Sequence, residues 1–195
     1  MAKPMSEITE QPEWSVPSFE TIFTGERSSD ACVIIPIINE GERVLTQLKR
    51  MQALGIEKKA DIILADGGST DGSTEQVRLK SLGVNSLLLK TGGGKLSAQL
   101  RMAYAFALRQ GYEQIVTIDG NNKDDPDTIP AFIDAIKRGC DFVQASRYLP
   151  GGEEERTPLL RSIAIRCIHA PMLSLCSGFK WTDTTQGYRA YSRRM

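Results

Sequence analysis

Two side chains that could bind a cation follow an apolar run in the segment IDGNNKDDP (118–126). Asp119 ends the run and Asn121 comes two positions later, so both can offer oxygen atoms to one hard cation. A calcium loop of the EF-hand type is excluded, because the sixth residue counted from Asp119 is Asp124 and the twelfth is Pro130. The pattern favours a metal-binding role for Asp119.

The glycine-rich loop TGGGKLS (91–97) could bind a phosphate. It is not a P-loop, since Leu89 stands where the first glycine is needed and Leu96 where Ser or Thr is needed. It is not a dinucleotide-binding loop either, because Ser97 occupies the last glycine position of GxGxxG. Two interpretations stay open: Lys95 meets a phosphate near a helix N-terminus, or it is a solvated lysine on a surface loop.

The segment ADGGSTDGST (65–74) also allows two interpretations. Asp66 stands at the end of an apolar run, where its carboxylate could accept hydrogen bonds from a base or a ribose. Alternatively the segment is only a turn, in which Gly67 and Gly68 supply unusual dihedral angles and one of residues 69–71 caps the next helix.

The elements that carry these residues alternate along the chain. Short apolar runs predict buried strands at 31–36, 61–65, 86–90, 114–118 and 141–145. Helical spacing predicts helices at 40–54, 71–82, 95–110 and 127–138, the last two ending at Gly111 and Gly139, with Asp125 and Asp127 as caps of the fourth. This alternation predicts an α/β fold with a Rossmann-like, mostly parallel sheet and helices on both faces. Ligands of such sheets gather beyond the carboxyl ends of the strands, where the polar clusters lie.

Length and composition narrow the function classes. The chain has 195 residues, enough for about one domain, and its 24 Lys and Arg balance 24 Asp and Glu, which argues against a nucleic-acid partner. Four scattered cysteines and one histidine argue against a zinc cluster and indicate a reduced, intracellular protein. Residues 1–30 have no apolar signal region and predict an irregular lead-in to a domain at 31–195. No apolar run approaches the roughly 20 residues that a bilayer span needs.

The segment 157–179 mixes apolar residues with Arg161 and Arg166. The favoured interpretation is a core helix with snorkelling arginines, interrupted before Pro171, in which His169 is packed. The alternative is a helix that lies on a membrane or holds a lipid tail. The acidic run at 153–155 predicts a solvated loop.

Taken in order, five segments resemble family 2 glycosyltransferases of the GT-A fold, most of all the dolichyl-phosphate mannosyltransferase-like branch. IIPIINEGERV resembles the P-x-Y-N-E stretch, ADGGSTDGS the D-D/G-G-S-x-D motif, and GGGK with Arg101 the G-K-G…R stretch. TIDGNNKDDPDTIP resembles the D-x-D region, while ASRYLPGG and DTTQGYRAYSR resemble the G-S-R-Y and D-x-x-S-G-F-R-A-Y-S-R segments.

The resemblance implies an inverting, metal-dependent transfer of a sugar from a nucleotide-sugar donor to an acceptor, a polyprenyl phosphate in this branch, as in the synthesis of cell-envelope glycans. It implies site residues in four roles: Pro36, Glu40, Asp66, Gly68 and Lys95 for the nucleotide; Asp119 and Asn121 for Mg²⁺ or Mn²⁺; Arg147, Gln186 and Arg189 for the acceptor; and Asp119, Lys95 and Asp183 for catalysis. A cytoplasmic enzyme, peripheral at the membrane, is expected.

Several positions depart from the family pattern. Asn121 replaces the second aspartate of D-x-D, Asp124 stands where this branch often has histidine, and Gln186 where serine is common. The chain stops at Met195, where relatives continue, as a truncated product would. The alternatives are a nucleotide-sugar-binding relative without catalysis, a transferase acting on a hydroxyl with Asp183 or Asp125 as base, and, third, a nucleotidyltransferase.

Overall fold

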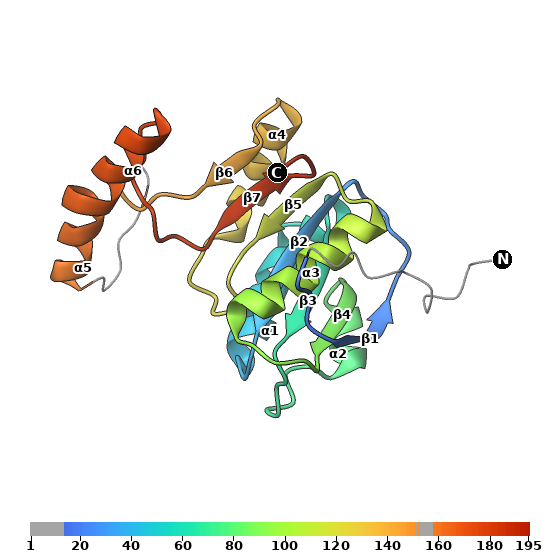
Figure 1. Cartoon of the computed structure of the whole chain (residues 1–195). Coiled ribbons are helices and arrows are strands. Elements are labelled where there is room, and N and C mark those ends of the chain that lie inside the picture. Colours follow the sequence, from blue (N-terminus) through green and yellow to red (C-terminus); the bar gives the residue numbers. More distant parts are fainter. Residues whose placement is uncertain (1–13, 151, 153–157) are drawn as a thin grey trace.

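The computed structural model describes residues 14–150, 152 and 158–195, and within them seven strands form one sheet in the order β1-β4-β3-β2-β5-β7-β6 (Figure 1). The central strands β4, β3, β2 and β5 are parallel, whereas β1 pairs antiparallel with β4, and β7 pairs antiparallel with both β5 and β6. The strands are β1 (Phe19–Thr24), β2 (Ala31–Ile37), β3 (Asp61–Asp66), β4 (Val84–Lys90), β5 (Gln114–Thr117), β6 (Phe142–Gln144) and β7 (Arg189–Ser192). The predicted α/β fold with a mostly parallel sheet is confirmed.

Helices cover both faces of the sheet because the central strands are apolar on both sides. Every residue of β2 and of β3 is buried. Alternate residues of β2 point to opposite faces, so that Val33 belongs to the core cluster that includes residues of α1, α2 and α4, while Ile34 belongs to the cluster that includes residues of α3. The four helices are α1 (Glu42–Ala53), α2 (Gln76–Ser81), α3 (Leu96–Gln110) and α4 (Ile129–Lys137).

The register of the parallel strands brings the polar clusters together. Ile37 of β2 lies opposite Asp66 of β3, and Ile34 lies opposite Thr117 of β5. The segments after these three strands therefore leave the sheet at one edge, as the strand order requires.

Three sequence expectations about elements need correction. The lead-in expected at 1–30 is not irregular throughout, because residues 19–24 form the edge strand β1; residues 1–13 lie outside the described part. The strand β7 was not expected, and it makes the last part of the sheet antiparallel. The second helix begins at Gln76 and not at Asp71, because Glu75 caps it, while the Asp71 carboxylate accepts hydrogen bonds from the backbone of Gly41 and Ser73.

The segment after β6 forms an arm that stands away from the sheet (Figure 1). It consists of α5 (Leu159–Ala164), a π-helical stretch (Ile165–His169) and α6 (Ala170–Ser177). The favoured core-helix interpretation is wrong, since Leu160 is 82% exposed and Leu175 is 87% exposed. His169 is exposed as well, so the packed-histidine expectation is also wrong. The acidic run at 153–155 lies outside the described residues.

The arm also corrects the expectation that no segment is long enough to span a bilayer. Its continuous helix Leu159–Ser177 has 19 residues and a mean hydropathy of 1.3, which suffices for a membrane span by length and composition. Only 17% of its most apolar window is buried in the protein.

Gly120 gives a test of how tightly the loop after β5 packs against the end of β2. A Cβ atom at Gly120 would lie 2.7 Å from Ile37 Cγ2 and 3.2 Å from the Pro36 carbonyl oxygen. We expect Gly120→Ala to lower the free energy of unfolding by about 1–3 kcal/mol, measured by urea denaturation. The matched control is Gly93→Ala, where a Cβ would meet nothing within 4 Å. Equal effects of the two substitutions would contradict the close packing.

Candidate active site

A cavity of about 540 Å³ opens at the carboxyl edge of the sheet. It gathers residues from the ends of β2 and β5, from the glycine-rich loop and from the start of α3. Five of the predicted site residues line it, namely Pro36, Glu40, Lys95, Asp119 and Asn121. The volume is of the size that holds a nucleotide-like ligand.

Gln99 of α3 fixes the shape of this cavity and was missed by the sequence analysis. Its buried side-chain amide donates hydrogen bonds to the Ile37 carbonyl oxygen, at 2.8 Å, and to the Ala65 carbonyl oxygen. The Gly67 N–H donates to the same Ile37 carbonyl at 2.9 Å. One side chain thus ties together the ends of β2 and β3. A signal was available, because Gln99 lies four residues before Ala103 on the apolar face of its helix.

The structure does not bring Asp66 into the cavity. Its carboxylate is buried and accepts hydrogen bonds from the Gly68 N–H at 3.1 Å, the Ser69 N–H at 2.9 Å and the Ser69 hydroxyl at 2.7 Å. Gly68 has φ +102°, a conformation that favours glycine, so the turn interpretation describes both residues. The member of this turn that lines the cavity is Gly67.

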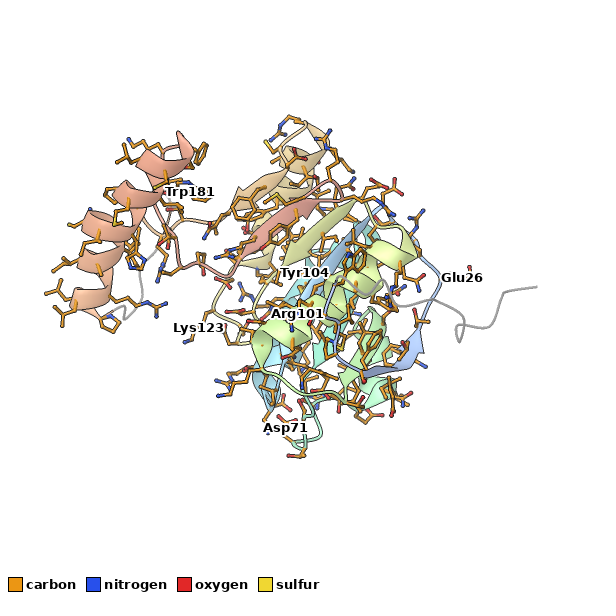
Figure 2. The ribbon with its side chains drawn as sticks, in the orientation of Figure 1. Glu26, Asp71, Arg101, Tyr104, Lys123 and Trp181 are labelled. Atoms are coloured by element: carbon orange, nitrogen blue, oxygen red, sulfur yellow. The ribbon has the colours of Figure 1, made fainter. Side chains whose placement is uncertain are left out.

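Arg101 also lies outside the cavity lining. Its Nε donates to the Ser15 carbonyl oxygen at 3.1 Å, which holds the chain before β1 against α3 (Figure 2). The cations that do line the cavity are Lys90, at the end of β4, and Lys95, the residue before the first turn of α3. Lys90 is not among the predicted site residues, although its place at the end of a predicted strand was a signal.

Two neighbouring carboxylates stand beyond β5. Burial raises the pKa of Asp119, and the charges of Lys123 and Arg189 offset part of this effect. Burial and the charge of Asp119 raise the pKa of Asp124, although Gln186 Nε2 donates to it at 3.0 Å. Within the described residues, no N–H or O–H donates to the Asp119 carboxylate. Two half-buried carboxylates whose charges act on each other attract a cation.

The remaining ligands for a cation would have to be neutral oxygens. The described residues contain no cluster of three or more His, Cys, Asp and Glu side chains that could hold a metal. Asn121 is near enough in sequence to contribute, but its side-chain oxygen already accepts from the Lys123 N–H at 3.1 Å. Magnesium commonly takes one or two carboxylates and completes its shell with water and phosphate oxygens.

A second cavity of about 440 Å³ is lined in part by the same loop, through Lys123, Asp124 and Asp125. Its lining includes Lys123, Asp124, Arg147 and Gln186. Lys123 projects from this loop on the side where the arm stands (Figure 2). Arg189 does not line either cavity; its Nε donates to the Gln186 carbonyl oxygen at 2.8 Å, while its charge acts on Asp119.

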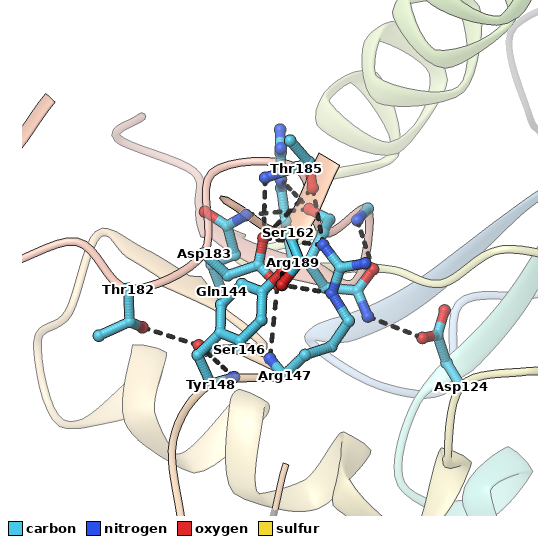
Figure 3. A network of polar contacts seen from close by, with 12 residues as sticks. Asp124, Gln144, Ser146, Arg147, Tyr148, Ser162, Thr182, Asp183, Thr185 and Arg189 are labelled. Carbon is cyan, nitrogen blue, oxygen red and sulfur yellow. Dashed lines mark hydrogen bonds and ion pairs between the residues drawn. The ribbon is translucent and has the colours of Figure 1, made fainter. Parts of the chain in front are cut away.

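Arg147 and Asp183 form an ion pair at the base of the arm (Figure 3). Arg147 Nε lies 2.8 Å from Asp183 Oδ2, and its terminal nitrogen donates to Asp183 Oδ1 at 3.1 Å and to the Thr185 hydroxyl at 2.7 Å. Burial opposes ionisation of Asp183, but the hydrogen bonds and charge of Arg147 outweigh it and hold the pKa of Asp183 below its ordinary value. This arrangement makes Asp183 a weak base, so its expected catalytic role is not supported by its surroundings.

The other candidate base, Asp125, is also paired. Its Oδ1 lies 2.9 Å from a terminal nitrogen of Arg50, and its side chain is exposed. It stands at the N-cap position of the 3-10 turn Pro126–Thr128 that leads into α4, as predicted, but its side chain makes no capping hydrogen bond there.

Comparison with known proteins agrees with this geometry. Residues 32–195 match the model of the family described as "Glycosyl transferase family 2". The chain is 28% identical to polyprenol monophosphomannose synthase of Mycolicibacterium smegmatis over 84% of this chain and 62% of that protein. It is 29% identical to undecaprenyl-phosphate mannosyltransferase of Micrococcus luteus, over 81% of this chain and 64% of that protein. The chain thus spans less than two thirds of either relative.

Solved structures show the same fold. Glucosyl-3-phosphoglycerate synthase from Mycobacterium tuberculosis, in complex with Mn²⁺, uridine diphosphate and glucosyl-3-phosphoglycerate, matches with a TM-score of 0.56. The match covers 86% of this chain and 57% of that chain, at 20% sequence identity.

Because burial raises the pKa of Asp119, the ionised Asp119 carboxylate should lower the free energy of unfolding at neutral pH. A carboxyl whose folded pKa lies above its unfolded value of about 3.9 loses stability as the pH rises through that interval. We expect Asp119→Asn to raise the free energy of unfolding at neutral pH, and the gain to shrink as the pH falls and to vanish below the unfolded pKa, toward about pH 3, where the carboxyl is protonated in both states. Chemical denaturation across this pH range measures the effect. Asp134→Asn, which replaces an exposed carboxylate of α4, is the control. A loss of stability at neutral pH would contradict the prediction.

The ion pair at the base of the arm predicts a larger effect of opposite sign. Arg147→Ala leaves the Asp183 carboxylate buried without its charge partner, so we expect a loss of about 3–5 kcal/mol, measured by thermal and urea unfolding. Arg78→Ala, which breaks an exposed pair with Glu42, should cost no more than about 1 kcal/mol. Adding Asp183→Asn to Arg147→Ala should recover part of the loss. Similar losses for the Arg147 and Arg78 variants would refute the structural role of the pair.

Proposed function

The chain belongs to glycosyl transferase family 2, and we propose on that basis that it transfers a sugar from a nucleotide-sugar donor to a polyprenyl phosphate. The relatives named above are a polyprenol monophosphomannose synthase and an undecaprenyl-phosphate mannosyltransferase. The observation that carries the proposal is that the loop after β5 lines two cavities, one with Asp119 to Asn121 and one with Lys123 to Asp125. Each cavity is lined by cations, Lys90 and Lys95 in the first and Lys123 and Arg147 in the second.

The first cavity suits the nucleotide-sugar donor. Pro36, Ile37 and Gly67 give it an apolar wall against which a base and ribose can lie. Lys90 and Lys95 provide positive charge for a diphosphate, and Lys95 does so directly before the N-terminus of α3, where backbone N–H groups favour an anion. In this proposal Glu40 contacts the nucleoside. Gly68 and Asp66 do not contact the donor: Gly68 adopts the backbone conformation that the turn requires, and the Asp66 carboxylate stabilises the turn by its hydrogen bonds, so that Gly67 can line the cavity.

The acidic edge of this cavity suits Mg²⁺ or Mn²⁺. The Asp119 carboxylate accepts no hydrogen bond from the described residues and has Asp124 beside it, so the residues present fit such an ion. Asp119 would hold it first, and the Asn121 amide oxygen would be a neutral second ligand. When bound, the ion would stabilise the charge that develops on the leaving nucleoside diphosphate.

The second cavity suits a phosphate monoester acceptor. Lys123 and Arg147 bring positive charge to its lining, and Gln186 brings an amide. In the proposal Arg189 supports the acceptor site without lining it. Its Nε donates to the Gln186 carbonyl oxygen, which positions Gln186, and its positive charge acts on Asp119. A polyprenyl phosphate is largely doubly ionised near neutral pH, because its second pKa is about 6. Its oxygen can attack the anomeric carbon without a base.

This independence from a base fits the paired state of Asp183 and Asp125. A hydroxyl acceptor would need a carboxylate to take its proton. The carboxylate whose raised pKa suits that task is Asp124, which lines the second cavity. Transfer to a hydroxyl is therefore the second candidate function, and it assigns the base to Asp124 and not to the two residues expected from the sequence.

In the proposed reaction the residues of this chain act mainly by position and charge. Lys95 and Lys90 hold the diphosphate, while Lys123 and Arg147 hold the acceptor phosphate on the far side of the sugar. The acceptor oxygen forms a bond to the anomeric carbon as the bond to the diphosphate breaks, with inversion. Such fixed charges stabilise the leaving group without reorganisation during the reaction.

The test is a transfer assay with a panel of nucleotide sugars and polyprenyl phosphate in detergent, with Mg²⁺ or Mn²⁺. We expect a glycosylated lipid phosphate and a free nucleoside diphosphate, and we expect Lys95→Ala to slow transfer roughly 100-fold, because it removes one charge from the leaving group. Lys49→Ala, which changes an exposed lysine of α1, is the matched control.

Three other outcomes would each contradict the proposal. Glycosylation of a soluble hydroxyl acceptor alone would establish the second candidate, and Asp124→Asn should then abolish activity. Donor binding without turnover for any acceptor would indicate a non-catalytic relative. Release of pyrophosphate would indicate a nucleotidyltransferase.

A further inference from the structure

The glycine-rich loop that carries the cations of the donor cavity has no regular structure of its own. Lys90 ends β4 and Lys95 precedes α3, and the residues between them belong to no helix or strand. Gly93, Gly94 and Lys95 are exposed. A loop of this kind samples many conformations unless other parts of the chain hold it, so the contacts of the loop decide where the two lysines lie.

The chain directly before β1 supplies such contacts. The Ser18 carbonyl oxygen accepts hydrogen bonds from the Thr91 N–H at 2.9 Å and from the Gly92 N–H at 2.7 Å. The Lys90 ammonium group in turn donates to the Gly92 carbonyl oxygen at 2.8 Å. A Cβ atom at Gly92 would lie only 2.7 Å from the Ser18 nitrogen and 3.1 Å from Pro17 Cβ. The two backbones therefore approach each other more closely than a side chain at position 92 would allow.

Residues 14–18, which we call the strap, are also fixed to α3, the helix that Lys95 precedes. Arg101 Nε donates to the Ser15 carbonyl oxygen at 3.1 Å (Figure 2). Val16 packs against the apolar cluster that includes residues of α3, and the Arg109 guanidinium lies 6.0 Å from the Trp14 ring. The strap thus connects the glycine-rich loop to α3. It lies before residue 32, where the match to the family begins.

We propose that the strap positions Lys90 and Lys95 for the diphosphate of the donor. It holds the glycine-rich loop in one conformation before the donor arrives, so that binding does not have to order the loop. Ser18 and Arg101 are then positioning residues. Ser18 acts through the loop backbone, and Arg101 acts through Ser15 without touching the diphosphate. The identity of the ligand rests on the proposed function, whereas the contacts of the strap do not.

Calorimetric titration of the full chain with uridine diphosphate and with guanosine diphosphate, each in the presence of Mn²⁺, tests the role of the strap. For whichever diphosphate binds, Gly92→Ala should weaken binding about tenfold, because its methyl group would push the strap off the loop. Arg101→Ala should weaken binding about fivefold, because it releases Ser15. Arg101→Lys should retain most of the affinity, because its ammonium group can donate to the same carbonyl oxygen.

Thr24→Ala is the matched control. It removes a hydrogen bond of 2.9 Å to the Ser86 hydroxyl at the other end of β1, so it weakens the same strand away from the loop. This protein should bind the diphosphate like the unmodified chain. In the transfer assay, Arg101→Ala should raise the KM of the donor about fivefold and leave kcat and the KM of polyprenyl phosphate unchanged. A general loss of stability would not divide the kinetic constants in this way.

Hydrogen exchange in the absence of ligand provides a second measurement. The Thr91 and Gly92 amides should exchange faster in Arg101→Ala than in Thr24→Ala. Unchanged diphosphate binding by Gly92→Ala and Arg101→Ala would overturn the proposal, as would equal weakening by Thr24→Ala. Diphosphate binding without transfer to any acceptor would count against the proposed function alone and leave the positioning role standing. Absence of diphosphate binding by the unmodified chain would overturn both.

Discussion

The ion pair between Arg147 and Asp183 is the constraint on which the second half of the structure depends. The chain leaves the sheet after β6 and returns to it at β7, with the whole arm between these two strands. Arg147 stands where the chain leaves and Asp183 where it returns, so their contact closes the excursion at its base. The Asp183 side chain is fully buried. Removal of Arg147 would leave a buried charge without a partner, so it would lower the stability by far more than the net stabilisation that the intact pair provides.

From this closed base a chain of contacts leads to the reacting edge. Thr185, which also binds Arg147, precedes Gln186, and Gln186 donates to Asp124 beside Asp119. The two carboxylates at the end of this chain are the reverse case of Asp183. They are half-buried, and the nearby cations compensate them only in part: burial and the charge of Asp119 raise the pKa of Asp124, and burial raises that of Asp119 despite the charges of Lys123 and Arg189. The Asp183 carboxylate is compensated by Arg147, whereas the other two keep negative charge that a ligand can meet.

The sequence reveals those parts of this architecture that follow from local chemistry. The runs that form β2 and β3 are apolar at every position, which is the property of a strand buried on both faces. Gly111 ends α3 in the left-handed conformation, as its position predicted. The strands β1 and β7 were not recognised because they are short and only partly apolar, and they exist through their pairing with β4 and β5. The partners of Asp66, Asp183 and Arg101 depend on tertiary contacts that no local pattern records.

The arm marks the limit of such inference most clearly. Apolar composition shows that a segment avoids water, but it does not distinguish a protein core from a lipid phase, and the core was the wrong choice here. Both ends of the arm return to the base that Arg147 and Asp183 close, and the same base lines the second cavity through Ser146 and Arg147. Under the proposed function a lipid phosphate would reach the second cavity beside the exposed apolar arm, while soluble nucleotides would enter the donor cavity.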